Sequence, residues 1–135
     1  MLVDRRGTPL AVRLTGANVH DSMTFADLLD AVKPVRQRRG RPRKRPKKLH
    51  ADKAYYDRKC RRALRQRGIQ SRIARKGKEP KDRLGRHRWV VERTFAWLNQ
   101  YRRLRVRYER RADLHLAFVL LGCALITWKA VIRFC

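Results

Sequence analysis

The sequence predicts an α/β fold, a mixed β-sheet with flanking helices. Segments in which apolar and polar residues alternate, as in strands, are interleaved with segments in which apolar residues recur every three or four positions, as in helices. A chain of 135 residues suits one domain, and 43% hydrophobic residues suffice for a core. The predicted order of elements, β-β-α-β-α-β-α-α, is typical of a mixed sheet.

The first elements are a hairpin and a helix. We expect residues 1–3 and 10–15 to pair as two strands around a turn at residues 6–9. Residues 25–32 carry apolar side chains at helical spacing, which predicts an amphipathic helix. Ser22 is the expected N-cap of that helix, and Pro34 is expected to end it.

A second strand–helix–strand pattern follows. Residues 48–51 are expected to form a short strand that ends at Asp52. Asp57 is a suitable N-cap for the next helix, and Gly68 is the expected C-terminal stop. The alternating residues 69–74 predict another strand.

Two helices are predicted in the C-terminal part, over residues 87–102 and 113–133. The apolar stretch within the second helix, residues 114–128, is shorter than the roughly 20 residues that a bilayer span needs. We therefore expect a buried packing helix and no membrane partner. Together the elements predict a single domain over residues 1–135.

The charge balance points to a polyanionic partner. Lys and Arg number 37 against 11 Asp and Glu, a formal net charge of +26. Such a charge makes nucleic acid the expected partner and an enzyme for small neutral metabolites improbable. The three cysteines form no C-x-x-C pair, which argues against a zinc module or a secreted disulfide framework. The cytoplasm is the expected compartment.

The positive charge is densest in a predicted loop over residues 36–48, which holds nine cations and no acid. Two prolines and a glycine in this stretch prevent a helix. The loop is expected either to hold the DNA backbone or to be merely solvated charge. Phosphate contacts are expected from Arg41, Arg43, Lys44 and Arg45, without sequence specificity.

Two of the few acids stand out. Asp52 follows a predicted strand, at the end where ligands collect in open α/β sheets, although a turn residue paired with Lys53 is the alternative. Glu92 is the only acid of a basic helix, on a face that we expect it to share with Arg88, Asn99 and Arg103. An ordinary Arg88–Glu92 pair is the alternative there.

The surroundings of Glu92 are apolar. Val91, Phe95 and Leu98 form an adjacent stripe that is expected to pack on the sheet. Two carboxylates brought together by a strand end and a helix can bind Mg²⁺, which prefers oxygen ligands. Metal ions held in this way activate the attacking oxygen in phosphodiester chemistry and stabilise the leaving one.

Four segments carry a resemblance to a known family: residues 4–10, 17–22, 50–55 and 88–98. In this order they resemble the C-terminal half of bacterial insertion-sequence transposases of the DDE class, most closely the insertion-sequence-five group. The resemblance implies an RNase H-like fold. It also implies an Asp-Asp-Glu triad that binds two Mg²⁺ or Mn²⁺ ions, cuts transposon ends and joins the freed 3′-hydroxyl to target DNA.

On this resemblance Asp52 matches the second acid of the triad and Glu92 the third, so both are the expected catalytic and metal-binding residues. The family signature Tyr-x2-Arg-x3-Glu-x6-Lys is matched at Arg88 and Glu92, while Gly85 and Asn99 stand at its Tyr and Lys positions. DNA contacts are expected from Arg88, Asn99, Lys53 and Trp97. A base-stacking role and core packing are both open for Trp97.

The first acid of the triad should lie on a strand that precedes the hairpin. We therefore expect a partial RNase H-like sheet without its first, central strand, either a downstream reading frame or a decayed fragment. Such a chain would be inactive unless an upstream segment is supplied. Expected partners are DNA, that upstream segment and further copies of the chain, at the bacterial nucleoid. The alternative function is a basic nucleic-acid-binding protein without catalysis.

Overall fold

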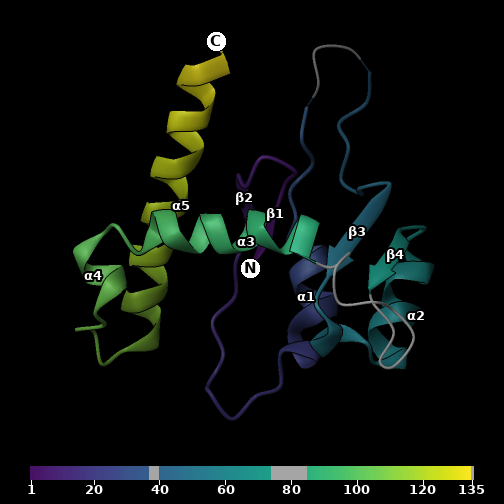
Figure 1. Cartoon of the computed structure of the whole chain (residues 1–135), viewed down its shortest axis with the longest axis horizontal. Helices are drawn as coiled ribbons and strands as arrows, with labels where there is room; N and C mark the ends of the chain where they lie inside the picture. The colour runs from purple at the N-terminus through teal and green to yellow at the C-terminus, as the bar shows by residue number, and fades with distance from the viewer. Residues whose placement is uncertain (37–39, 74–84, 135) are drawn as a thin grey trace. The chain divides into compact units, whose positions relative to one another are not determined.

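The computed structural model describes the backbone of residues 1–36, 40–73 and 85–134 (Figure 1). The chain divides into two compact units. The first unit contains residues 1–14 and 89–135, and the second contains residues 15–88. Both strands and helices are present, so the α/β class is confirmed, whereas the single domain over residues 1–135 stays a prediction.

A strand–helix–strand motif forms the centre of the second unit. Strand β3 (Lys48–Ala51) pairs in parallel with β4 (Gln70–Ile73), and helix α2 (Arg58–Gln66) connects them. Asp57 caps α2 by accepting a hydrogen bond from the Lys59 amide at 3.1 Å. Gly68 follows α2 with φ +65°, a conformation that glycine adopts without steric cost.

The core of the second unit comes from both strands and two helices. The short helix η1 (Asp21–Thr24) leads into α1 (Phe25–Asp30). The side chains with the least exposure come from α1, β3, α2, β4 and the adjoining turns: Phe25, Leu28, Leu29, Val32, Leu49, Cys60, Ala63, Leu64, Ile69 and Ile73. The predicted apolar faces of these elements are therefore confirmed.

An ion pair joins α1 to the end of α2. Arg67 donates from Nε to Asp30 Oδ1 at 2.8 Å and from Nη2 to Asp30 Oδ2 at 2.5 Å. The Arg67 guanidinium thereby lowers the pKa of Asp30. Arg67 also donates from Nη1 to the Ala63 carbonyl at 2.9 Å, which fixes its guanidinium at the C-terminal end of α2.

The first unit begins with a hairpin. Strands β1 (Leu2–Val3) and β2 (Pro9–Ala11) pair antiparallel, as predicted, and the turn between them contains Gly7 at φ +85°. The predicted second strand of residues 10–15 is wrong in its extent. Residues 12–15 lie outside any strand, and Arg13, Leu14 and Thr15 are exposed.

Three helices complete the first unit: α3 (Gly85–Leu98), from residue 89 onward, α4 (Arg102–Arg105) and α5 (Ala112–Phe134). Leu98 packs with Val119, Cys123 and Ile126 of α5. A Cβ atom added to Gly122 would lie 2.9 Å from both Leu98 and Leu104. The absence of a side chain at Gly122 thus lets the ends of α3 and α4 approach α5 closely.

Helix α5 is only partly buried. Its apolar residues on one side are between 40% and 63% exposed: Leu114, Leu120, Leu121, Leu125, Trp128, Val131 and Ile132. The predicted packing helix is therefore present, but it is buried on one side only. Within the described residues, one helix, Ala112–Arg133, is long enough and apolar enough to cross a membrane, on the criteria of length and composition alone.

Several predicted helix boundaries are wrong. The helix expected over residues 87–102 begins at Gly85 and ends at Leu98, because the chain turns at residues 99–101 before α4 begins. Ser22 is not a helix N-cap. His20 is the N-cap residue of η1, and its Nδ1 accepts from the Ser22 amide at 3.3 Å.

The predicted basic loop of residues 36–48 is confirmed as an irregular segment in its described part, apart from Lys48, which is the first residue of β3. Residues 37–39 lie outside the described structure. Val35, just before the loop, and Arg43 within it exchange two backbone hydrogen bonds, at 2.8 and 2.9 Å. Residues 36 and 40–48 are exposed, so their cations face solvent.

Candidate functional site

Asp52 lies directly after β3 and is held by its own turn. It caps the short helix η2 (Lys53–Tyr55) by accepting a hydrogen bond from the Lys53 amide at Oδ1, at 2.5 Å. Its carbonyl accepts from the Tyr55 amide at 3.0 Å. The position at the carboxyl end of a strand is thus confirmed. Asp52 is also a turn residue, through the backbone amide of Lys53, while its ion pairing with the Lys53 side chain stays a prediction.

The structure brings a second carboxylate toward the same turn. Tyr55 is half-buried, and burial is the main cause of its raised pKa. The negative charges of Asp21 and Asp52 raise the pKa further. Asp21 and Asp52 therefore both lie within electrostatic reach of Tyr55, a relationship that spacing along the sequence did not reveal.

Glu92 lies on α3 with its side chain exposed. The helix that carries it is fixed to the hairpin turn of the first unit. Arg93 donates from Nη2 to the Arg6 carbonyl at 2.6 Å, and the Thr94 hydroxyl donates to the Gly7 carbonyl at 2.7 Å. Thr94 has 0% exposure, so this contact lies in the core of the first unit. The hairpin turn therefore fixes the part of α3 that carries Glu92.

Two indole rings flank the same guanidinium. The Arg93 Cζ atom lies 4.4 Å from the ring centroid of Trp89 and 4.9 Å from that of Trp97. These are cation–π distances. Trp97 packs against the core cluster, whereas Trp89 is 48% exposed. Core packing, one of the two roles open for Trp97, is therefore present.

The crowding at Gly7 yields a stability prediction. A Cβ atom at this position would lie 3.0 Å from Thr94 Oγ1 and 3.3 Å from Trp97, on a backbone at φ +85°. We expect Gly7→Ala to lower the free energy of unfolding by about 2 kcal/mol in urea titrations.

Gly68→Ala is the matched control, because Gly68 also has a positive φ but no atom within 4 Å of an added Cβ. It is expected to lose only the backbone part of that energy, about 1 kcal/mol. Equal losses of unfolding free energy in the two variants would show that the hairpin turn is not closely packed against α3.

The other predicted site residues are distributed between the two units. Lys53 follows Asp52 and is partly buried, while Asn99 is exposed just beyond α3. The Asn99 amide donates to the Phe95 carbonyl at 2.9 Å. Arg88 lies on the backbone of α3, and its side chain is outside the described structure. The contacts of these residues with DNA stay predictions.

Two expectations about α3 are wrong. Phe95 is 46% exposed and does not complete the packing stripe with Leu98, because the core lies on the Thr94 and Leu98 side of the helix. Arg103 does not continue the Glu92 face, because it belongs to α4 and pairs with Glu109 at 2.8 Å.

The predicted metal ligands belong to different units, Asp52 to the second and Glu92 to the first. Their convergence on one ion therefore stays a prediction. Both supply carboxylate oxygens, the donors that Mg²⁺ and Mn²⁺ accept. Among the described residues, no group of three or more His, Cys, Asp or Glu side chains is placed to hold a metal ion.

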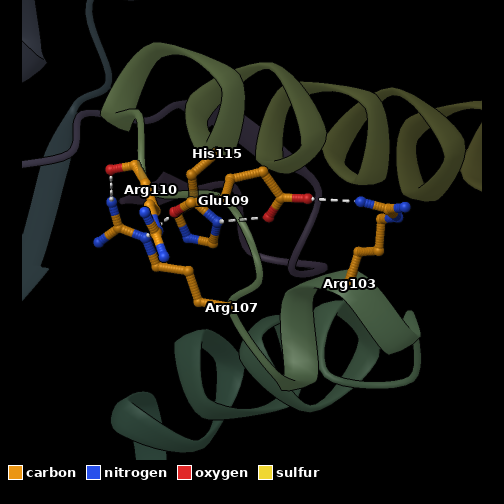
Figure 2. Close-up of polar contacts among 5 residues, drawn as sticks. All are labelled: Arg103, Arg107, Glu109, Arg110 and His115. Carbon is orange, nitrogen blue, oxygen red and sulfur yellow. Dashed lines mark hydrogen bonds and ion pairs between the residues drawn. The ribbon is translucent and has the colours of Figure 1, made fainter.

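Sequence reasoning missed one enclosed carboxylate, Glu109, in the turn between α4 and α5 (Figure 2). Its side chain is 6% exposed, and Oε1 accepts from Arg103 Nη1 at 2.8 Å. His115 Nδ1 lies 3.9 Å from Oε2. The hydrogen bond from Arg103 lowers the pKa of Glu109. Only the tertiary structure identifies this residue, since nothing in its spacing marks it.

This lowered pKa predicts acid sensitivity. A carboxyl group whose pKa is lower in the folded than in the unfolded chain stabilises the fold above the unfolded value of about 4.3, and that stability is lost as pH falls through the folded pKa. We expect Glu109→Gln to lower the urea midpoint at pH 7, and the difference from wild type to shrink toward pH 3.

Asp27→Asn serves as the control, because Asp27 is an exposed acid on α1 outside the ion pairs described above. We expect it to leave the urea midpoint nearly unchanged at pH 7. A Glu109→Gln midpoint shift that persists unchanged at pH 3 would contradict the electrostatic explanation.

Comparison with known proteins defines the class of the chain. Residues 1–127 match the family described as Transposase DDE domain, so the chain belongs to the DDE transposase family. It is 52% identical over 133 residues to a Burkholderia cepacia protein named for the transposase of insertion sequence element IS402. The match covers 98% of this chain and 63% of that relative, so the chain spans less than two thirds of the relative's length. No solved structure matches the chain.

Proposed function

We propose that the chain contributes to DNA transposition by supplying two catalytic carboxylates and a DNA-holding surface for strand cleavage and transfer at insertion-sequence ends. The observation that carries this proposal is the family match over residues 1–127. Asp52 at the end of β3 and Glu92 on α3 stand at the positions that the family resemblance assigns to catalytic acids. The net charge of +26 supports a polyanionic substrate.

In this proposal Asp52 and Glu92 hold Mg²⁺ or Mn²⁺, which would activate the attacking oxygen and stabilise the leaving oxygen of a phosphodiester. Neighbouring residues hold these two carboxylates in place. The Lys53 amide orients Asp52, and the contacts of Arg93 and Thr94 with the hairpin turn hold the helix of Glu92. DNA contacts are proposed for Arg88, Asn99, Lys53, Trp97 and the loop of residues 36–48.

The complete catalytic unit is proposed to be an RNase H-like sheet whose first strand and first acid come from a further segment. The match to only 63% of the relative's length supports a larger active protein. We further propose that several copies act together on DNA in the bacterial cytoplasm, at the nucleoid. Dependence on a second segment explains why two acids, rather than three, are assigned here.

The alternative proposal is a basic nucleic-acid-binding protein without catalysis. The observation that favours it is the lack, within the described residues, of three or more clustered metal-ligating side chains. The two proposals make the same prediction for DNA binding and opposite predictions for cleavage.

A cleavage assay separates them. The isolated chain is expected to bind a plasmid that carries the two ends of the element and to leave it uncut in the presence of Mg²⁺. Adding the part of the Burkholderia relative that lies outside the match, fused or in trans, is expected to produce nicks at those ends. Cutting by the isolated chain would refute the need for a further segment, and no cutting in either case would favour the binding protein.

A further inference from the structure

The turn between α4 and α5 carries a second concentration of positive charge. We define residues 102–111 as the arginine turn. It contains six arginines and one acid, Glu109. It lies in the first unit, whereas the basic loop of residues 36–48 lies in the second. The arginine turn is therefore a separate cationic feature, to which the functional assignment above gives no role.

The arginine turn is held by two contacts with α5 and by polar contacts within the turn itself. Leu104 packs against the space left by Gly122 on α5. Arg103 pairs with the enclosed Glu109 and lies 5.3 Å from the ring centroid of Phe118. Arg107 donates to the carbonyls of Glu109 at 2.9 Å and Arg110 at 3.3 Å (Figure 2). These contacts fix the backbone of the arginine turn before any ligand binds.

The remaining cations are available to a ligand. Arg102, Arg105 and Arg110 are exposed, and none of their guanidinium groups has a hydrogen-bond or ion-pair partner within the part of the chain that the structure describes. Guanidinium groups recognise phosphate oxygens in a bidentate manner. A fixed backbone lowers the entropic cost of presenting them.

The arginine turn also carries an exposed aromatic ring. Tyr108 is 55% exposed, and the neighbouring Val106 is 51% exposed. A solvent-facing tyrosine surrounded by cations is typical of single-stranded nucleic-acid sites, in which the cations follow the backbone and a base stacks on the ring. Duplex DNA offers no unstacked base to such a ring.

We propose that the arginine turn binds single-stranded DNA, with Arg102, Arg105 and Arg110 on the phosphates and Tyr108 stacked on an unpaired base. The inference deepens the proposed function, because it rests on DNA being the partner. A strand end freed by cleavage can fray from its partner strand, and frayed nucleotides are ligands of this chemistry. The role of the arginine turn is to hold such an end and does not include the chemical step.

The test measures binding of the full chain to a fluorescein-labelled 20-nucleotide single strand and to its duplex (about the length that several contacts need) in EDTA. Tyr108→Ala is expected to weaken single-strand binding about tenfold and duplex binding less than twofold. Tyr108→Phe keeps the ring and is expected to bind the single strand like wild type. The Arg102→Gln, Arg105→Gln, Arg110→Gln variant is expected to lower the salt slope for the single strand by about 2.

The matched control removes three exposed cations elsewhere in the first unit, through Arg13→Gln, Lys129→Gln and Arg133→Gln. It is expected to lower the salt slope by less than half as much. Equal losses in the two triple variants, or an unchanged affinity in Tyr108→Ala, would overturn the proposal. Because the assay contains no divalent metal and leaves Asp52 and Glu92 intact, such a result would not count against catalysis.

Discussion

Asp52→Asn and Glu92→Gln are each expected to lower Mg²⁺-dependent cleavage by about a thousandfold or more, measured in the complete, cleavage-competent protein. Each change removes one anionic metal ligand while keeping the size of the side chain. Affinity for DNA is expected to stay within about twofold, because the cations that neutralise phosphates are untouched. Initial rates of nicking and anisotropy binding curves on the same DNA measure the two quantities.

Asp57→Asn is the matched control for Asp52→Asn. Asp57 is an exposed acid of the same unit, and asparagine caps a helix as well as aspartate does. Its cleavage rate is expected to equal that of wild type. If Asp52→Asn and Glu92→Gln both cut at the wild-type rate, the chain is better described as a nucleic-acid-binding protein.

Removing the charge of the basic loop is expected to have the second largest effect. Arg41, Arg43, Lys44 and Arg45 are all exposed. Arg43 is joined to Val35 by two backbone hydrogen bonds, and Lys44 and Arg45 directly follow it. The fourfold glutamine variant at these positions is expected to lower the slope of log affinity against log salt by about 3 to 4 on duplex DNA. The loss is expected to be equal on unrelated sequences, since phosphate contacts carry no sequence information.

A fourfold control removes the same charge from the same unit. It replaces by glutamine the exposed cations of α2, which are Arg58, Lys59, Arg62 and Arg65. We expect this control to change the slope by less than 1, about a quarter of the loop effect. Equal slopes for the two variants would mean that net charge, rather than the loop, determines affinity.

Much of the second unit could be predicted from the sequence, because its elements are short and strongly patterned. Ile69 and Ile73 alternate with exposed Gln70 and Arg72, so the strand was evident. The residue after β3, Asp52, was placed correctly at a strand end for the same reason. Local pattern was sufficient wherever local packing determines the structure.

The first unit was less predictable, because contacts distant in the sequence determine it. Nothing local shows that Arg93 and Thr94 bind a turn 87 positions away. The end of α3 at Leu98 was also missed, since helical spacing continues beyond it while the chain turns to pack α4 against Gly122. The half-exposed face of α5 could not be distinguished from a buried face by composition alone.

The candidate site was predicted in its chemistry but not in its surroundings. Carboxylates that are rare in a basic chain were identifiable one by one, and so Asp52 and Glu92 could be named. The link between Asp21 and Tyr55 and the enclosure of Glu109 depend on the approach of separate elements. Contacts of this kind are visible only in the three-dimensional structure.

The central claim is that Asp52 and Glu92 hold the same divalent ion. Fe²⁺ can replace Mg²⁺ at oxygen-ligand sites and, with ascorbate and peroxide, cleaves the backbone beside its ligands. In the wild-type chain we expect cuts near both residue 52 and residue 92, and we expect Asp52→Asn to abolish both sets. Cuts near only one of the two residues, or loss in Asp52→Asn of only the cuts near residue 52, would contradict a shared site.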